Sequence, residues 1–178
     1  MLLVVAATER ELGAVEGADT LVCGVGPVEA AAATARALAE RRPRAVLHVG
    51  LAGGRGLEPC TAVLGTESLY EDLEAAIPVI DRAEPATALV DALAAAVPEL
   101  RRLPIATSAR VGAAAGAAVE AMEGFGVLRA AALAGIPAVE VRVVSNEIGE
   151  RDRTRWRFDD ALETLEALLP RLLAAVRP

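Results

Sequence analysis

Two carboxylates and one amide stand beside stretches of sequence that are apolar enough to be buried strands. Glu11 follows the first such stretch, Glu123 stands between Met122 and Gly124, and Asn146 follows the last. A carboxylate supplies negative charge and accepts hydrogen bonds, whereas an Asn amide both donates and accepts them. Around one cavity, these groups could bind a polar small molecule. Taken alone, Glu11 could equally be a solvated residue in a first helical turn, Glu123 an exposed loop charge, and Asn146 a turn residue.

Two glycine-rich stretches add backbone donors to this set. The first is Gly24-Val25-Gly26, followed by Pro27, which suits the first turn of a helix. The second is residues 50–56. Bare N–H groups at the start of a helix suit an anion. However, neither stretch is a Walker motif or a complete G-x-G-x-x-G fingerprint, so these glycines do not establish a phosphate site.

The elements that must position these residues alternate between strands and helices. Strands are expected at residues 2–7, 20–23, 45–50, 61–70, 75–80, 103–107 and 138–145. Helices are expected at residues 28–41, 86–97, 126–135 and 158–176, with loops at 51–56 and 146–157. The alternation predicts one α/β domain over residues 1–178, with a mixed, mostly parallel sheet flanked by helices. Because ligands in such folds bind beyond the carboxyl ends of the strands, the glycines, carboxylates and amide should meet at one sheet edge.

The composition indicates an aliphatic core and argues against nucleic acid as a partner. Of the 178 residues, 54% are hydrophobic but only 2% are aromatic, so Ala, Leu, Val and Ile must fill the core. The net charge is −7, from 25 acidic and 18 basic residues. Nucleic-acid binding needs a basic face that displaces counterions, and this charge balance does not favour one.

Cysteine content and hydropathy indicate the compartment. Cys23 and Cys60 are too few for a disulfide framework or a zinc site, and they suit a reducing cytosol as buried small hydrophobes. The apolar opening at residues 2–7 has no basic residues before it, and no apolar run approaches the ~20 residues of a membrane-spanning helix. We therefore expect a cytoplasmic protein with no membrane partner, no metal and no cofactor.

Five short motifs follow one another along the chain, at residues 6–11, 24–27, 49–54, 122–124 and 143–146. Their order and spacing resemble the nucleoside phosphorylase and nucleosidase family, which cleaves purine N-glycosidic bonds. Within that family the sequence looks most like the members that hydrolyse futalosine. The signs are Val119-Glu120-x-Met122-Glu123-Gly124, Val141-Arg142-x-x-Ser145-Asn146 and Gly149-x-Arg151-Asp152-Arg153-x-x-Trp156. The resemblance implies a nucleoside phosphorylase-like fold and release of hypoxanthine from futalosine, in menaquinone biosynthesis.

The resemblance also implies a role for each site residue. Glu11 matches the carboxylate that positions and deprotonates the attacking water, and Glu123 matches the one that grips the ribose hydroxyls. The other residues expected to bind substrate are Met122, Gly24, Gly26, Gly53, Ser145 and Arg110. Because the sugar becomes cationic as the bond breaks, negative charge beside the ribose favours the reaction.

Asn146 is the position that discriminates between bases. Family members that cleave adenine nucleosides carry Asp here, which can donate a proton to N7. Hypoxanthine presents a carbonyl at O6 instead, and an Asn amide can bond to N7 and O6 without the repulsion of a carboxylate. Asn146 therefore favours a 6-oxopurine, the base that futalosine carries.

Two departures from the phosphate-using relatives favour water as the nucleophile. Those relatives bring an Arg and a Ser to phosphate, and the matching positions here look like His48 and Leu51. The Leu51 side chain offers no hydrogen bond, and a neutral imidazole is a poor anion ligand. His48 in an apolar strand fits a hydrogen-bonded core residue better than a ligand. The alternatives left open are an inosine-type phosphorylase, an aminofutalosine or methylthioadenosine nucleosidase, and a nucleoside-binding protein without turnover.

The polar segment at residues 149–157 has two interpretations. It could be a solvated loop whose arginines pair with its own acids, with Trp156 as an anchor. Alternatively, one of its arginines, or Arg110, binds the carboxylate of the benzoate group of futalosine, because Arg forks onto carboxylates.

The apolar region at residues 61–80 suggests a partner subunit. Within it, Tyr70 and Asp72 could face the partner. The family commonly forms dimers or larger rings, and covering an apolar surface would stabilise this short chain. We expect a homodimer or a larger homo-oligomer.

Overall fold

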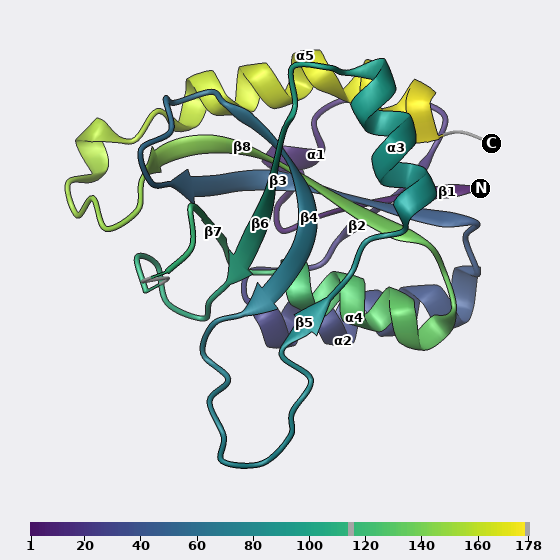
Figure 1. Cartoon of the computed structure of the whole chain (residues 1–178). Helices are drawn as coiled ribbons and strands as arrows, with labels where there is room; N and C mark the ends of the chain where they lie inside the picture. Colours follow the sequence, from purple (N-terminus) through teal and green to yellow (C-terminus); the bar gives the residue numbers. More distant parts are fainter. Residues whose placement is uncertain (114–115, 177–178) are drawn as a thin grey trace.

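A computed structural model describes residues 1–113 and 116–176 of the chain (Figure 1). Its strands are β1 (Leu2–Ala6), β2 (Asp19–Val22), β3 (Ala45–Gly54), β4 (Ala62–Tyr70), β5 (Arg82–Ala83), β6 (Arg101–Thr107), β7 (Val119–Ala121) and β8 (Ala138–Glu147). Its helices are α1 (Glu9–Leu12), α2 (Pro27–Arg41), α3 (Thr87–Ala96), α4 (Gly124–Ala134) and α5 (Phe158–Val176), with a 3-10 turn at Arg153–Arg155. The four longer helices lie where the sequence predicts them, to within two residues.

The helices cover both faces of the sheet, α1, α3 and α5 on one and α2 and α4 on the other (Figure 1). The strand at the N-terminus shows why. Leu2 and Val4 join the apolar core beneath α3 and α5, whereas Leu3 and Val5 join the core above α2 and α4. Because successive side chains of a strand point to opposite faces, a continuous apolar run is what a strand covered on both sides requires.

The sheet is mixed and partly closed on itself. β1 pairs in parallel with β2 and β3, and β3 pairs in parallel with β8. β8 continues antiparallel to β4, β4 pairs in parallel with β6, and β6 with β7, which returns antiparallel to β3. Side chains from these strands form a third apolar cluster, which includes Val63, Ile105 and Val144. The predicted α/β class, with a mixed and mostly parallel sheet, is confirmed.

The prediction of a glycine loop at residues 51–56 is wrong, because β3 runs on through Gly54. These glycines allow side chains of a neighbouring strand to come close to the backbone of β3, rather than forming a turn. A Cβ on Gly54 would lie 2.9 Å from Val144 Cγ1, and one on Gly50 would meet the Arg142 guanidinium. Glycine inside a strand marks places where another group comes close to the backbone. Here those places are beside β8.

The prediction of a strand at residues 75–80 is also wrong. Residues 71–81 form an exposed loop that projects from the molecule, and pairing resumes only at the two residues of β5 (Figure 1). The apolar residues that suggested a strand are exposed instead, Ile77 by 71% and Ile80 by 54%. Conversely, the sequence does not predict the short strand β7. Strand β8 includes both Ser145 and Asn146, whereas the sequence predicts that the strand ends at Ser145 and that a loop begins at Asn146.

Two further observations bear on cofactors and membranes. Within residues 1–113 and 116–176, no helix has the length and apolar character needed to cross a bilayer. Over the same residues, no group of three or more His, Cys, Asp or Glu side chains could hold a metal ion.

Cys23 is buried, as expected, whereas Cys60 is only half-buried. Burial and the nearby Glu123 raise the pKa of the Cys23 thiol to about 12, so this thiol stays protonated.

Candidate active site

A cavity of about 580 Å³ opens at the carboxyl ends of β1, β3 and β8. Its polar lining includes Glu11, Glu123, Ser145 and Asn146. Its apolar lining consists of Val25, Leu51, Val111, Met122, Trp156, Phe158 and Leu162, with smaller residues between them. A mostly apolar pocket with a few convergent polar groups is typical of a small-molecule site.

The cavity brings together most of the residues singled out from the sequence. Its lining includes six of them: Glu11, Gly53, Met122, Glu123, Ser145 and Asn146. Gly24 and Gly26 lie behind it in a turn with positive φ angles of 81° and 98°, where Gly26 N–H donates to Glu123 Oε1 at 3.2 Å. Arg110 is exposed and lies outside the lining, although its neighbour Val111 belongs to it.

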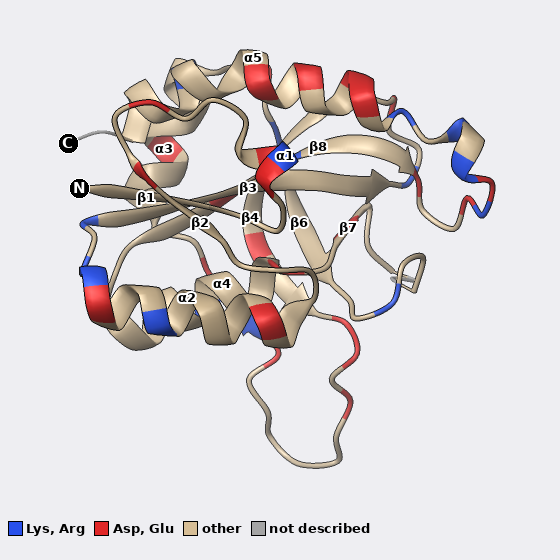
Figure 2. Ribbon diagram, turned by 180° about the vertical axis from the view of Figure 1, so that it is seen from behind, with Lys and Arg blue, Asp and Glu red and all other residues tan. Residues whose placement is uncertain are grey.

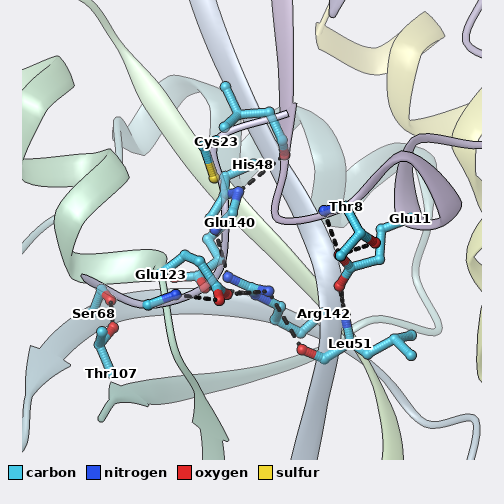
Figure 3. A network of polar contacts seen from close by, with 12 residues as sticks. Thr8, Glu11, Cys23, His48, Leu51, Ser68, Thr107, Glu123, Glu140 and Arg142 are labelled. Atoms are coloured by element: carbon cyan, nitrogen blue, oxygen red, sulfur yellow. Dashed lines mark hydrogen bonds and ion pairs between the residues drawn. The ribbon is translucent and has the colours of Figure 1, made fainter. Parts of the chain in front are cut away.

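Glu11 is fixed by three hydrogen bonds at the start of α1 (Figure 3). Its Oε2 accepts from the backbone N–H of Thr8 at 3.0 Å and from the Thr8 hydroxyl at 2.8 Å. Its Oε1 accepts from the backbone N–H of Leu51, on β3, at 3.0 Å. Glu11 does lie in the first turn of a helix, but its carboxylate is held against β3 at the cavity wall rather than left free in solvent.

Glu123 is held by a buried arginine, Arg142 (Figure 3). Its Oε2 forms an ion pair with Arg142 Nη1 at 3.2 Å. Arg142 Nε donates to Glu140 Oε1 at 2.8 Å, and its Nη1 also donates to the carbonyl of Leu51 at 3.3 Å. The Arg142 side chain has no exposed surface, and those of Glu123 and Glu140 are 5% and 1% exposed. Burial raises the pKa of Glu140, while the guanidinium acts in the opposite direction.

His48 belongs to the same network and stays neutral. Its Nδ1 lies 3.0 Å from the carbonyl of Val5, which can only accept, so Nδ1 carries the proton. Its Nε2 is then the acceptor that faces Arg142 Nη2. Burial, and then the charge of Arg142, hold the pKa of His48 well below its usual value. The prediction of a hydrogen-bonded core histidine is confirmed.

A bulge in β8 turns two consecutive side chains toward the cavity. Ala52 pairs with Val144 but Gly53 pairs with Asn146, so β8 contains one extra residue, Ser145, at this point. In a regular strand these neighbours would face opposite sides, and a bulge redirects them. Both Ser145 and Asn146 therefore line the cavity.

The amide orientation of Asn146 follows from its partners. Nδ2 donates to the carbonyl of Glu147 at 3.0 Å, which only an amide N–H can satisfy. Oδ1 accepts from the Ser145 hydroxyl at 2.7 Å. A Cβ at Gly53 would lie 3.4 Å from Nδ2, so glycine leaves this amide room. One N–H and one oxygen lone pair of Asn146 remain for a ligand.

The segment between β8 and α5, for which the sequence left two interpretations open, supplies another part of the cavity wall. Trp156 lines the cavity, and its Nε1 donates to the carbonyl of Glu150 at 3.0 Å, which anchors the segment as expected. Acidic and basic residues lie close to one another along this segment (Figure 2). Thr8, Arg10, Arg153, Phe158 and Leu162 also line the cavity and were not singled out individually as site residues. In the sequence, Phe158 and Leu162 belong to the apolar face of a helix, which usually packs into the core. Arg153 belongs to a charged loop, which usually lies in solvent.

Residues 20–177 match the family model described as the phosphorylase superfamily. A futalosine hydrolase of Streptomyces coelicolor is 36% identical over 178 residues, which cover 84% of this chain and 76% of that protein. A futalosine hydrolase of Thermus thermophilus is 42% identical over a shorter stretch of 59 residues, 33% of this chain and 26% of that protein.

Solved structures confirm the predicted fold. A futalosine hydrolase mutant of Helicobacter pylori has a TM-score of 0.87 at 15% identity, covering 98% of this chain and 99% of that one. A 5′-methylthioadenosine/S-adenosylhomocysteine nucleosidase from Neisseria meningitidis, in complex with methylthio-immucillin-A, has a TM-score of 0.82 at 22% identity, covering 98% and 96%. The chain therefore has the fold of these nucleosidases.

Proposed function

Because the chain belongs to the phosphorylase superfamily, we propose that it hydrolyses the N-glycosidic bond of futalosine and releases hypoxanthine. The similarity to the Streptomyces coelicolor futalosine hydrolase supports this substrate. The observation that carries the proposal is that Glu11, Glu123 and Asn146 line one cavity, each held in place by hydrogen bonds. These are the groups that the reaction needs for water, sugar and base.

Glu11 is the proposed general base. Its three hydrogen bonds leave a lone pair on Oε1, which can take a proton from a water molecule as that water attacks C1′ of the ribose. The new bond is C1′–O and the broken bond is C1′–N9. The electron pair of the broken bond leaves with the base as an anion, which takes up one proton from the medium to become hypoxanthine. Holding the carboxylate rigidly keeps this water in position for attack.

Glu123 is the proposed ribose ligand. Arg142 and the N–H of Gly26 each occupy one of its oxygens, which leaves a lone pair on each oxygen for the ribose hydroxyls. The sugar becomes cationic in the transition state, so its attraction to this carboxylate grows as the bond breaks. An interaction that strengthens in the transition state raises the rate rather than only the affinity.

Asn146 is the proposed reader of the base. Its free N–H can donate to N7 or O6 of hypoxanthine, and its free lone pair can accept from an N–H of the departing base. An Asp at this place would put negative charge beside O6. The amide thus suits a 6-oxopurine.

Water, rather than phosphate, is the proposed nucleophile. Leu51 presents an apolar side chain to the cavity, and both its backbone groups already bond to Glu11 and Arg142. His48 is neutral, buried and directed at Val5 and Arg142 rather than at the cavity. At the two positions that would bind phosphate in phosphorolytic relatives, the polar groups therefore already bond to other residues of the protein.

The setting of this activity follows from the substrate. Hydrolysis of futalosine would be a step of menaquinone biosynthesis, and the proposed location is the cytoplasm. The proposed domain is a single nucleoside phosphorylase-like domain over residues 1–178, with no cofactor.

The proposed assembly is a homodimer or a larger homo-oligomer. The loop at residues 71–81 carries Ile77, Val79 and Ile80, all of which are exposed on the projecting side of the molecule. Exposed apolar groups on one loop are stabilised when a second copy covers them. Sedimentation should show at least a dimer at micromolar concentration, and a fully active monomer would refute this assembly.

The proposed function is tested by chromatography of the products. Futalosine, aminofutalosine, inosine and methylthioadenosine are each incubated with the protein, with and without phosphate. We expect hypoxanthine from futalosine at the same rate in both buffers, and slower release from the other nucleosides. A strict phosphate requirement with a sugar 1-phosphate product would indicate a phosphorylase, faster release from an adenine nucleoside would indicate a different nucleosidase, and no release would indicate a binding protein.

A further inference from the structure

One end of the cavity is not used by the proposed contacts to base, ribose and water. Its lining comes from Arg153, Trp156, Phe158 and Leu162, which follow β8 in the sequence. We infer that this end binds an aromatic carboxylate, with Arg153 as the ligand of the carboxylate. The inference rests on the proposed function, because futalosine carries a benzoate group at the end of the molecule remote from hypoxanthine.

Arg153 is the arginine that both lines this end of the cavity and is available to an anion, whereas Arg151 of the same segment lies outside that lining. Its guanidinium carbon lies 5.4 Å from the centre of the Trp156 ring. Within residues 1–113 and 116–176, no carboxylate lies within the 4.0 Å ion-pair distance of Arg153. Its neighbours are engaged, Arg155 with Glu150 at 3.3 Å and Arg157 with Asp160.

Arg10 is the competing candidate, because it also lines the cavity. Its Nη2, however, pairs with Asp159 at 2.8 Å. A ligand carboxylate would have to displace that acid from Arg10, whereas the guanidinium N–H groups of Arg153 have no carboxylate to displace. A guanidinium that rests on an aromatic face keeps its edge N–H groups free for a planar carboxylate.

The wall beside Arg153 suits an aryl ring. The ring centres of Trp156 and Phe158 are 5.1 Å apart, with the planes tilted by 53°. Phe158 is 40% exposed, although it is a large apolar side chain. An aromatic ring laid against Phe158 and Leu162 would cover this surface, which is the usual way in which aromatic groups gain affinity.

The segment is anchored relative to the base-reading residue. Arg157 N–H donates to the carbonyl of Ser145 at 2.8 Å, next to Asn146. Asp152 caps the 3-10 turn by accepting from Thr154 N–H at 3.0 Å. Arg153 therefore sits at a set place along the cavity. The carboxylates of Glu11 and Glu123 repel an anionic group from the ribose site, so one ligand orientation is favoured.

The kinetic test compares Arg153→Gln with Arg155→Gln, a matched variant in the same turn whose arginine is paired within the protein. Each is assayed with futalosine and with its benzoate methyl ester, which keeps the ring but loses the charge. We expect Arg153→Gln to lower the ratio of the specificity constants, futalosine over ester, by about tenfold through KM, the scale of a charge-assisted hydrogen bond at a partly exposed site. Arg155→Gln should leave that ratio as in the wild type. An unchanged ratio in Arg153→Gln overturns the inference while leaving futalosine hydrolysis intact.

A binding measurement tests the inference without turnover. Trp156 is the single Trp of the chain, so its fluorescence reports on this end of the cavity alone. Benzoate should quench it at a concentration about tenfold lower than benzamide, its neutral counterpart, and the difference should disappear in Arg153→Gln. Equal quenching by both compounds in the wild type overturns the carboxylate site. Failure of the proposed function would instead appear as absent futalosine hydrolysis with this preference for benzoate preserved.

Discussion

The floor and the rim of the cavity use the same pairing of Arg with carboxylates in opposite surroundings. At the floor, Arg142 joins Glu123 and Glu140 with almost no exposure to water. At the rim, Arg10 and Asp159 form a pair whose side chains are 71% and 84% exposed. Solvent screens the rim pair, so losing it costs little stability. At the floor, removing Arg142 would leave buried charge uncompensated. The floor therefore fixes Glu123, the carboxylate that we propose binds the ribose, and the rim is free to adapt to a particular substrate.

The elements explain this division. The floor is built from β3 and β8, whose register places Gly50 opposite Arg142 and leaves room for its guanidinium. The rim is built from α1, which carries Arg10, and from the chain after β8, whose side-chain hydrogen bonds lie mainly within residues 150–160. A strand pairing holds a side chain more rigidly than a surface turn does.

The largest expected effect comes from removing the central cation of the floor. Arg142→Met should lower the free energy of unfolding by about 3–5 kcal/mol, because Glu123 and Glu140 would remain buried without a cationic partner. Urea denaturation of the wild type and the variant measures the difference. A loss below about 1 kcal/mol would mean that the floor behaves like the rim.

Asn146→Asp should change which base is preferred. A carboxylate oxygen would face the carbonyl of Glu147, now 3.0 Å from Nδ2, and would repel O6 of hypoxanthine. A mismatch of this kind costs about 1–3 kcal/mol, so the preference for futalosine over aminofutalosine should fall by about 10- to 100-fold. Specificity constants for both compounds in both proteins give this ratio. If it does not move, Asn146 does not read the base.

The floor should also give the fold a dependence on pH. The folded pKa of His48 lies well below its unfolded value of 6.5, so under acid the unfolded chain binds a proton that the folded one does not. Stability from this group is present above pH 6.5 and is lost as the pH falls below it. Between about pH 6.5 and about pH 5.5 the loss should be about 1 kcal/mol.

His48 is the single His of the chain, so His48→Gln isolates this contribution. Urea midpoints measured across that pH range should decline more steeply for the wild type than for the variant. Parallel profiles would show that the imidazole is not held neutral in the fold.

The smallest expected effect comes from an exposed ion pair far from the floor. Arg171→Gln removes the pair with Glu99, in which the side chains are 46% and 51% exposed. Stability should change least in this variant, by the same urea measurement, because solvent screens an exposed pair. A loss as large as that of Arg142→Met would remove the distinction between buried and exposed pairs.

Strand and helix patterns in the sequence predicted the elements that carry the site. The apolar run before Glu11 and the alternating run before Asn146 are β1 and β8. The same patterns failed at the glycines of β3, since glycine at a close approach and glycine in a loop look alike in sequence. The prediction of a strand at residues 75–80 failed for the converse reason, because the apolar residues of this exposed loop have the pattern of a strand.

The buried network was the part that sequence reasoning missed. Glu140 and Arg142 stand two residues apart in a strand, so they share one face, and a charged face usually indicates solvent. Their opposite signs, within a run flanked by valines, were the available signal of a buried pair. The bulge at Ser145 had no signal, because it depends on how β8 pairs with β3.

The most direct measurement is the rate of hypoxanthine release from futalosine in phosphate-free buffer, by the wild type and by Glu11→Gln side by side. Gln keeps the size of the side chain but cannot take a proton, so release should fall by ~10²-fold or more, the scale of a lost general base. Futalosine should still quench Trp156 in the variant, which shows that the cavity is intact. Phosphate-independent release by the wild type, together with this loss, is the predicted result. No release by the wild type without phosphate, or equal release by both proteins, would contradict hydrolysis by water that Glu11 activates.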